Sequence, residues 1–165
     1  MSRFVCGVLL SAFASVTLGQ GSLEAENIEA LLKLAGNGEH AAQHALCYRF
    51  LYGEGVEKNL PNAVHWCQIA AESSDSNSQT LLAEIYYKGE AVPVDYKKAL
   101  ALFQAAAEQD HRHAQYMLSK MYFFGQGTAP DSTIGLKWLK RAAAQGYEPA
   151  IETLRKFENA SHSGA

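Results

Sequence analysis

The histidines are the residues of this sequence whose spacing comes nearest to a chemical site. His40 and His44 stand four residues apart, a spacing that can hold zinc on one helix face, and His111 and His113 stand two apart. No third ligand follows at a spacing typical of a metal site, and the sequence contains no HExxH, CxxC, SxxK or GxSxG motif. We therefore expect no metal, no cofactor and no catalytic residues, and interpret these histidines as exposed residues near helix starts.

Three glycine-containing stretches could form loops that hold a ligand. They are FLYGEGVEKN at 50–59, YYKGEAVPVD at 86–95 and YFFGQGTAPD at 122–131. A phosphate loop requires Gly-Lys-Ser/Thr at the start of a helix, and a calcium loop requires alternating carboxylates and a bidentate Glu. Neither pattern is present. The stretches instead recur every 36 residues, which indicates the hinge of a structural repeat.

The same period holds on both sides of the glycines. The residues in phase are Leu46, Leu82, Leu118 and Leu154; Phe50, Tyr86 and Tyr122; Trp66, Leu102 and Trp138; and the pairs Ala70-Ala71, Ala106-Ala107 and Ala142-Ala143. Apolar residues within each unit are spaced by three and four, which is the period of an amphipathic helix. Each unit is therefore predicted to be a hairpin of two helices, A and B, and the chain to be all-α.

Each hinge carries the residues that end one helix and begin the next. Gly53, Gly89 and Gly125 are predicted to end helix A in the left-handed conformation, which glycine adopts without steric cost. Asn59, Asp95 and Asp131 are predicted to cap helix B. In the third unit Gly135 stands where the other units have alanine, so we expect alanine there to be neutral or stabilising.

The combined pattern LxxxYxxGxGVxxDxxxAxxW…AA resembles the Sel-one-like repeat (SLR) family, whose members are relatives of tetratricopeptide repeats. The resemblance covers about residues 39–157, with Ala91, Thr128 and Gly135 departing from the pattern. It implies a right-handed α/α solenoid of three 36-residue hairpins, at 39–74, 75–110 and 111–146. It also implies that the A helices line a concave surface and that the usual activity is protein binding.

Terminal helices are expected to cover the two ends of the stack. Residues 22–38 read as an N-terminal capping helix with Ser22 as its cap, and 147–158 as a C-terminal capping helix with Ile151, Leu154 and Phe157 on one side. Residues 159–165 are expected to be a tail.

The first 19 residues read as an export signal. Arg3 precedes an apolar run that is rich in Ala and Ser, and cleavage after Gly19 or Gly21 would fit the small residues there. The whole chain has a formal net charge of −3, and losing Arg3 makes it one unit more acidic. We expect a periplasmic or secreted protein that binds no nucleic acid and inserts stably into no membrane after cleavage.

Cys47 and Cys67 remain as an even pair after cleavage, and their state is left open. An oxidising compartment favours a disulfide. An offset of roughly 6 Å along the helices, added to an interhelical gap of 8 to 10 Å, argues for free thiols unless small residues draw the helices together.

The expected binding surface is the concave side of the A helices. At about 100° per residue, that side is predicted to carry more aromatic rings than a solvated face usually does. The candidate partner-binding residues are Tyr48, Tyr52, Tyr87, Tyr116, Phe123, Phe124 and His44.

The predicted function is that of a non-enzymatic module, monomeric alone, which binds a protein or peptide in this groove. The resemblance leaves open a regulator of a membrane sensor, an envelope assembly factor or an immunity protein against a delivered toxic effector. The alternatives are an enzyme of the β-lactam-binding SLR type and a passive structural protein of the envelope.

Overall fold

The computed structural model describes residues 20–163, which form eight α-helices and no strand. The expected export signal, 1–19, lies outside the described residues. The helices are α1 (Gln20–Gly36), α2 (His40–Tyr52), α3 (Leu60–Glu72), α4 (Ser76–Lys88), α5 (Tyr96–Glu108), α6 (Arg112–Phe124), α7 (Ser132–Ala144) and α8 (Glu148–Ser163).

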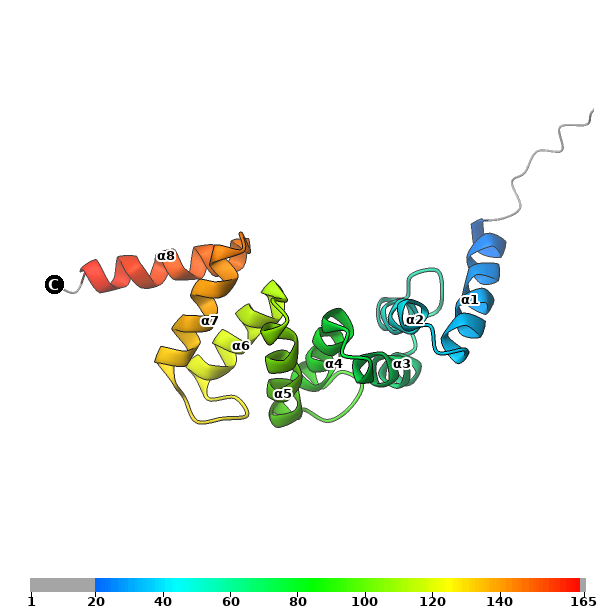
Figure 1. Cartoon of the computed structure of the whole chain (residues 1–165), viewed down its shortest axis with the longest axis horizontal. Coiled ribbons are helices and arrows are strands. Elements are labelled where there is room, and N and C mark those ends of the chain that lie inside the picture. The colour runs from blue at the N-terminus through cyan, green and yellow to red at the C-terminus, as the bar shows by residue number, and fades with distance from the viewer. Residues whose placement is uncertain (1–19, 164–165) are drawn as a thin grey trace, which may run out of the picture.

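The helices follow one another in a curved row, with α1 and α8 at opposite ends (Figure 1). The pairs α2/α3, α4/α5 and α6/α7 are the three predicted hairpins, each with a 13-residue helix A and a 13-residue helix B. The prediction of an all-α solenoid built from helical hairpins is confirmed.

The hinge within each hairpin is built as the sequence predicts. Gly53, Gly89 and Gly125 follow helix A in the left-handed conformation, with φ of 76°, 72° and 67°. The side chains of Asn59, Asp95 and Asp131 accept hydrogen bonds from backbone amides in the first turn of helix B. The predicted helix stops and caps are confirmed.

The turn between hairpins contains a second left-handed position that the sequence interpretation missed. Gly38, Ser74, Asp110 and Gly146 are 36 residues apart and have φ of 91°, 63°, 62° and 73°. Only the first and last are glycines. The two inner turns therefore hold an ordinary residue in a conformation that costs it free energy.

Burial follows the repeat, because each hairpin packs on the next. Leu46, Leu118, Phe103, Met121 and Leu139 are fully buried. The clusters they form join helices of neighbouring units, so the core is continuous along the row.

Helix α1 packs on α2 and helix α8 packs on α7, at the two ends of the row of hairpins. In α8, Arg155 stands where helix A of the other units has the fully buried Cys47, Ala83 or Ser119. Arg155 is exposed, so this position of α8 is not part of a core as it is in the three hairpins.

The observed ends of these helices differ from the predicted ones. Helix α1 begins at Gln20, before the expected cap Ser22, and α8 continues to Ser163 through most of the expected tail. No glycine or proline interrupts α8 between Pro149 and Gly164, which explains its length.

Candidate protein-binding surface

The A helices line an open hollow of about 260 Å³. Its lining residues are His44 and Tyr48 of α2, Asn77, Thr80, Leu81 and Glu84 of α4, and His111 and His113 at the start of α6. A narrower cleft of about 100 Å³ lies beside it, where Tyr52 meets Glu84, Ile85 and Lys88. Helices α2, α4 and α6 thus form one continuous face, which we call the A-helix face.

Three of the predicted binding residues expose large apolar surface. Tyr48 is 38% exposed, Tyr52 48% and Phe124 69%. The rings of Tyr48 and Tyr52 lie 4.7 Å apart between centroids, and the Tyr48 hydroxyl donates to Glu54 Oε1 over 3.3 Å. His44 lines the same hollow as Tyr48, whereas Phe124 lies at the far end of α6 and lines neither cavity.

Tyr87 contacts both its own hairpin and the next one. Its ring contacts Tyr96 and Phe103 of α5, with centroids 5.4 and 6.4 Å away. Its hydroxyl donates to Gln126 Oε1 in the hinge of the next hairpin, over 3.1 Å. The half-buried Tyr87 therefore holds two units together.

Tyr116 and Phe123 are likewise half-buried in contacts with the C-terminal end. Phe123 stacks on Phe157 of α8, with centroids 5.1 Å apart. Tyr116 packs on Tyr147, and Lys120 Nζ lies 5.7 Å from its ring centroid. A helical wheel gives the direction of a side chain but not the neighbour it meets, so the sequence alone did not reveal the contacts of these two rings with Tyr147 and Phe157.

A polar network that the sequence interpretation missed crosses the A-helix face. His113 Nε2 donates to Glu84 Oε1 and Lys88 Nζ donates to Glu84 Oε2, each over 2.8 Å. His113 Nδ1 lies 2.7 Å from the hydroxyl of Tyr147. Burial alone would raise the pKa of Glu84, but these two hydrogen bonds outweigh it and lower the pKa to about 2. Glu84 is therefore ionised, and the network ties α4 to α6 and to the turn before α8.

His111 is the second histidine of this region and caps α6. Its Nδ1 accepts from the backbone N–H of Ala114 over 3.2 Å, and its Nε2 lies 3.2 Å from Asn77 Oδ1. Burial lowers the pKa of His111, and the charge of His113 lowers it further.

Buried glutamines form a further repeat. Gln43, Gln79 and Gln115 are 36 residues apart and nearly or fully buried at the start of each helix A. Gln115 Nε2 donates to the carbonyl of Ala107 in the preceding hairpin, and its Oε1 accepts from Gln145 at the end of its own. Their period in the sequence was a signal that could have revealed this contact.

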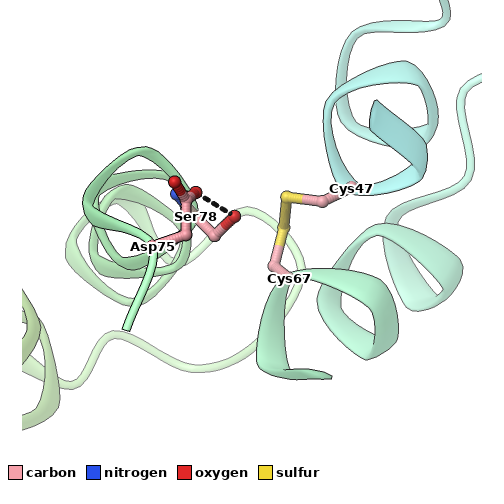
Figure 2. The surroundings of a disulfide bond; sticks show 4 residues. All are labelled: Cys47, Cys67, Asp75 and Ser78. Atoms are coloured by element: carbon pink, nitrogen blue, oxygen red, sulfur yellow. Dashed lines mark hydrogen bonds between the residues drawn. A yellow bond between two sulfur atoms is a disulfide. The ribbon is translucent and has the colours of Figure 1, made fainter. Parts of the chain in front are cut away.

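Cys47 of α2 and Cys67 of α3 are joined by a disulfide, with their Cα atoms 4.8 Å apart (Figure 2). Both residues are fully buried. The question left open by the sequence is thus answered in the structure by a bond, because the two Cα atoms lie much closer together than the estimated offset and interhelical gap would allow. Figure 2 also shows the cap of α4 next to the bridge, where Asp75 accepts from the hydroxyl of Ser78 over 2.6 Å.

The part of the chain that the structure describes contains no group of three or more His, Cys, Asp or Glu placed to hold a metal ion. His40 Nδ1 instead lies 3.3 Å from Gln43 Oε1. Among residues 20–163, no helix has both the length and the apolar character needed to cross a membrane.

These features define a helical-repeat scaffold that carries an open surface on one set of its helices. The model of the Sel1 repeat matches residues 40–75, 76–111 and 112–147, each starting one residue after the predicted unit. The chain therefore belongs to the Sel1 repeat family.

Three solved structures show the likeness. A Sel1 repeat protein from Oxalobacter formigenes is 34% identical with a TM-score of 0.71, covering 79% of this chain and 98% of that one. A protective antigen of uropathogenic Escherichia coli with an SLR fold is 29% identical, with a TM-score of 0.77, and the match covers 79% of this chain but 28% of that protein. Cysteine-rich protein B of Helicobacter pylori is 18% identical, with a TM-score of 0.64 over 82% of this chain and 97% of that one, which is a likeness of fold.

Proteins with Sel1 repeats bind other proteins, and the fold is typically a scaffold without catalytic activity. The chain is thus a protein-interaction module by family.

Proposed function

We propose that this protein is exported to the periplasm or the cell exterior and binds a protein or peptide through the A-helix face. The observation that carries the proposal is the pair Tyr48 and Tyr52, both exposed beside the hollow and the cleft that α2 forms with α4. Aromatic side chains next to concave surface are the residues that dominate the energy of protein interfaces.

The floor of this surface is already ordered. Glu84 is held by Lys88 and His113, and its side chain is only 16% exposed. A partner that docks against it need not immobilise these groups, so less of the binding free energy is lost to ordering. The mixed charge of the floor suits a partner segment with an apolar side chain for the tyrosines and polar groups around it.

Two observations support export. The apolar run before Gly19 has the composition of a cleaved signal, and the remaining cysteines form a buried disulfide. Structural disulfides are rare in reducing compartments and common in exported proteins. A regulator that docks on a membrane sensor, an assembly factor and an immunity protein are the roles that such a module would serve, and the identity of the captured partner distinguishes them.

Site-specific photo-crosslinking in the native host tests both binding through the A-helix face and export. A photoreactive amino acid replaces Tyr52 or, as a matched control, Ala101, which is exposed on helix B of the second hairpin. We expect the position 52 variant to give a discrete adduct in the exported fraction and the position 101 variant to give none. Adducts that form from position 101 alone would refute the assignment of the face, and retention of the protein in the cytoplasm would refute export.

A further inference from the structure

The cap of α6 differs in kind from the other side-chain caps. Among helices α2 to α7, the caps that accept through an oxygen are Asn59, Asp75, Asp95 and Asp131, whereas α6 has His111. An oxygen of Asn or ionised Asp keeps its acceptor lone pairs near neutral pH, but a histidine nitrogen accepts only while the ring is neutral. The cap of α6 is thus the one of these five that protonation of a ring nitrogen can remove.

The hydrogen bonds around His111 define its neutral form. Nδ1 accepts from the Ala114 amide, so the ring proton lies on Nε2, which donates to Asn77 Oδ1 of α4. Thr80 Oγ1, also of α4, lies 3.2 Å from Nδ1 and donates its own proton to the carbonyl of Ser76. His111 therefore joins the first turn of α6 to the first turns of α4.

The surroundings of His111 disfavour a positive charge. The charged and titratable groups around it are Asp75 at the cap of α4, Glu84 of α4, the adjacent Asp110, Arg112 and His113 of α6, Tyr147 before α8 and His44 across the hollow. The acids favour protonation, but Glu84 is already paired with Lys88 and Asp110 with Arg141. Burial, the neighbouring His113 and Arg112, and the positive end of the α6 dipole act in the opposite direction.

We propose that the junction of α4 and α6 is a pH-sensitive element of the A-helix face, which opens when His111 is protonated. The proposal rests on the proposed function for its biological meaning, because the junction forms the floor of the binding surface. It concerns the free protein, however, and does not require a partner to be observed.

Protonation places a hydrogen on Nδ1, which can then donate only to Thr80 Oγ1. The Ala114 amide loses its acceptor, and His111 becomes a cation beside the ring of His113, whose centroid lies 6.5 Å away. His113 sits in the same first turn, so its contacts with Glu84 and Tyr147 depend on the turn that the cap holds. Loosening of this turn therefore reaches the hollow between α2, α4 and α6.

The direction of the pH effect follows because His111 can cap α6 only while its ring is neutral. The folded protein holds the pKa of His111 below its unfolded value of about 6.5, so the stabilisation by the cap is complete above that pH. It is lost progressively as the pH falls from 6.5 towards the lower folded pKa. The junction is closed at neutral pH and loosens under mildly acidic conditions.

Amide hydrogen exchange on the purified protein tests this at about pH 7.5 and about pH 5, corrected for the intrinsic exchange rate. We expect protection in the first turn of α6 to fall about fivefold at the lower pH, the effect of losing one typical cap. In His111→Asn, an amide oxygen caps the helix as Asn59 does for α3, so protection should stay constant. His65→Asn, at an exposed residue of α3, should behave as the wild type.

Wild-type protection that does not change with pH would overturn the proposal. The same decrease in His111→Asn would also overturn it, because the pH dependence would then belong to a group other than His111. Failure of the crosslinking experiment at position 52 would leave these exchange rates unaffected, so the two hypotheses fail separately.

Discussion

Replacing Gly135 by alanine is expected to destabilise the protein, although Ala63 and Ala99 occupy the equivalent position in the other units. A Cβ on Gly135 would lie 3.0 Å from two ring carbons of Phe123 and 3.1 Å from the carbonyl oxygen of Ser119. Favourable carbon contacts lie at about 3.5–4.0 Å, so the ring would have to move by about half an ångström. Overpacking of this kind costs about 1–3 kcal/mol, while alanine gains about 1 kcal/mol of helix propensity. We expect a net loss of about 1 kcal/mol, against the stabilising or neutral effect that the repeat alone predicts.

A second substitution separates the two contributions. In a Phe123→Leu background, which copies Leu51 of the first unit, the added methyl meets a smaller side chain and Gly135→Ala should stabilise by up to about 1 kcal/mol. The double-mutant cycle should therefore give a coupling of about 1–2 kcal/mol. Urea unfolding followed by far-ultraviolet circular dichroism and by tryptophan fluorescence measures the stability of all four proteins. If Gly135→Ala has the same effect in both backgrounds, contact with the Phe123 ring does not explain the glycine.

Three further changes test other parts of the structure. Ser74→Gly should raise the free energy of unfolding by up to about 1 kcal/mol, since Ser74 is exposed with φ of 63°; a loss in urea melts would contradict the strain. Cys47→Ala with Cys67→Ala should lower it by about 3 kcal/mol, because the bridge closes a separation of 20 residues, and wild type in reductant should lose as much. The ionised Glu84 should contribute fully to the free energy of unfolding above pH 4.5, and this contribution should be lost as the pH falls to about 2. Urea melts at several pH values should show this decrease in the wild type and not in Glu84→Gln.

The fold could be predicted from the sequence because the period of 36 residues gives the boundaries of each hairpin, which the pattern of a single helix does not. The glycines Gly53, Gly89 and Gly125 mark the end of helix A in each unit. A capping residue six positions later, such as Asn59 or Asp131, then marks the start of helix B. Local rules of this kind involve residues close in sequence. Their success shows that the hinges are determined locally.

The binding surface could be predicted only in part. Its side chains contact one another across different units, at positions that are not equivalent in the repeat. A shift of 36 residues relates Glu84 to Lys120, whereas the structure pairs Glu84 with His113 and joins His113 to Tyr147. A comparison of equivalent positions cannot find such a contact. The same limit explains Tyr87, whose hydroxyl reaches the hinge of the next hairpin. Tyr48, Tyr52, Tyr87, Tyr116, Phe123, Phe124 and His44 remain predictions as binding residues.

The contacts between units differ along the row, and this has a consequence for binding. In a repeat scaffold each unit is stabilised mainly by its neighbours, so a surface that spans three helices keeps its shape only if both of its junctions are closed. Between α4 and α6 the A-helix face is held by hydrogen bonds through His111 and His113. The first hairpin is instead fixed internally by the buried bridge of Cys47 and Cys67. Tyr48 and Tyr52 therefore stand on the rigid hairpin, while the opposite wall of the hollow moves with the histidines. A partner that contacts both walls must bind more weakly when the α4–α6 junction opens, by the free energy needed to close it again.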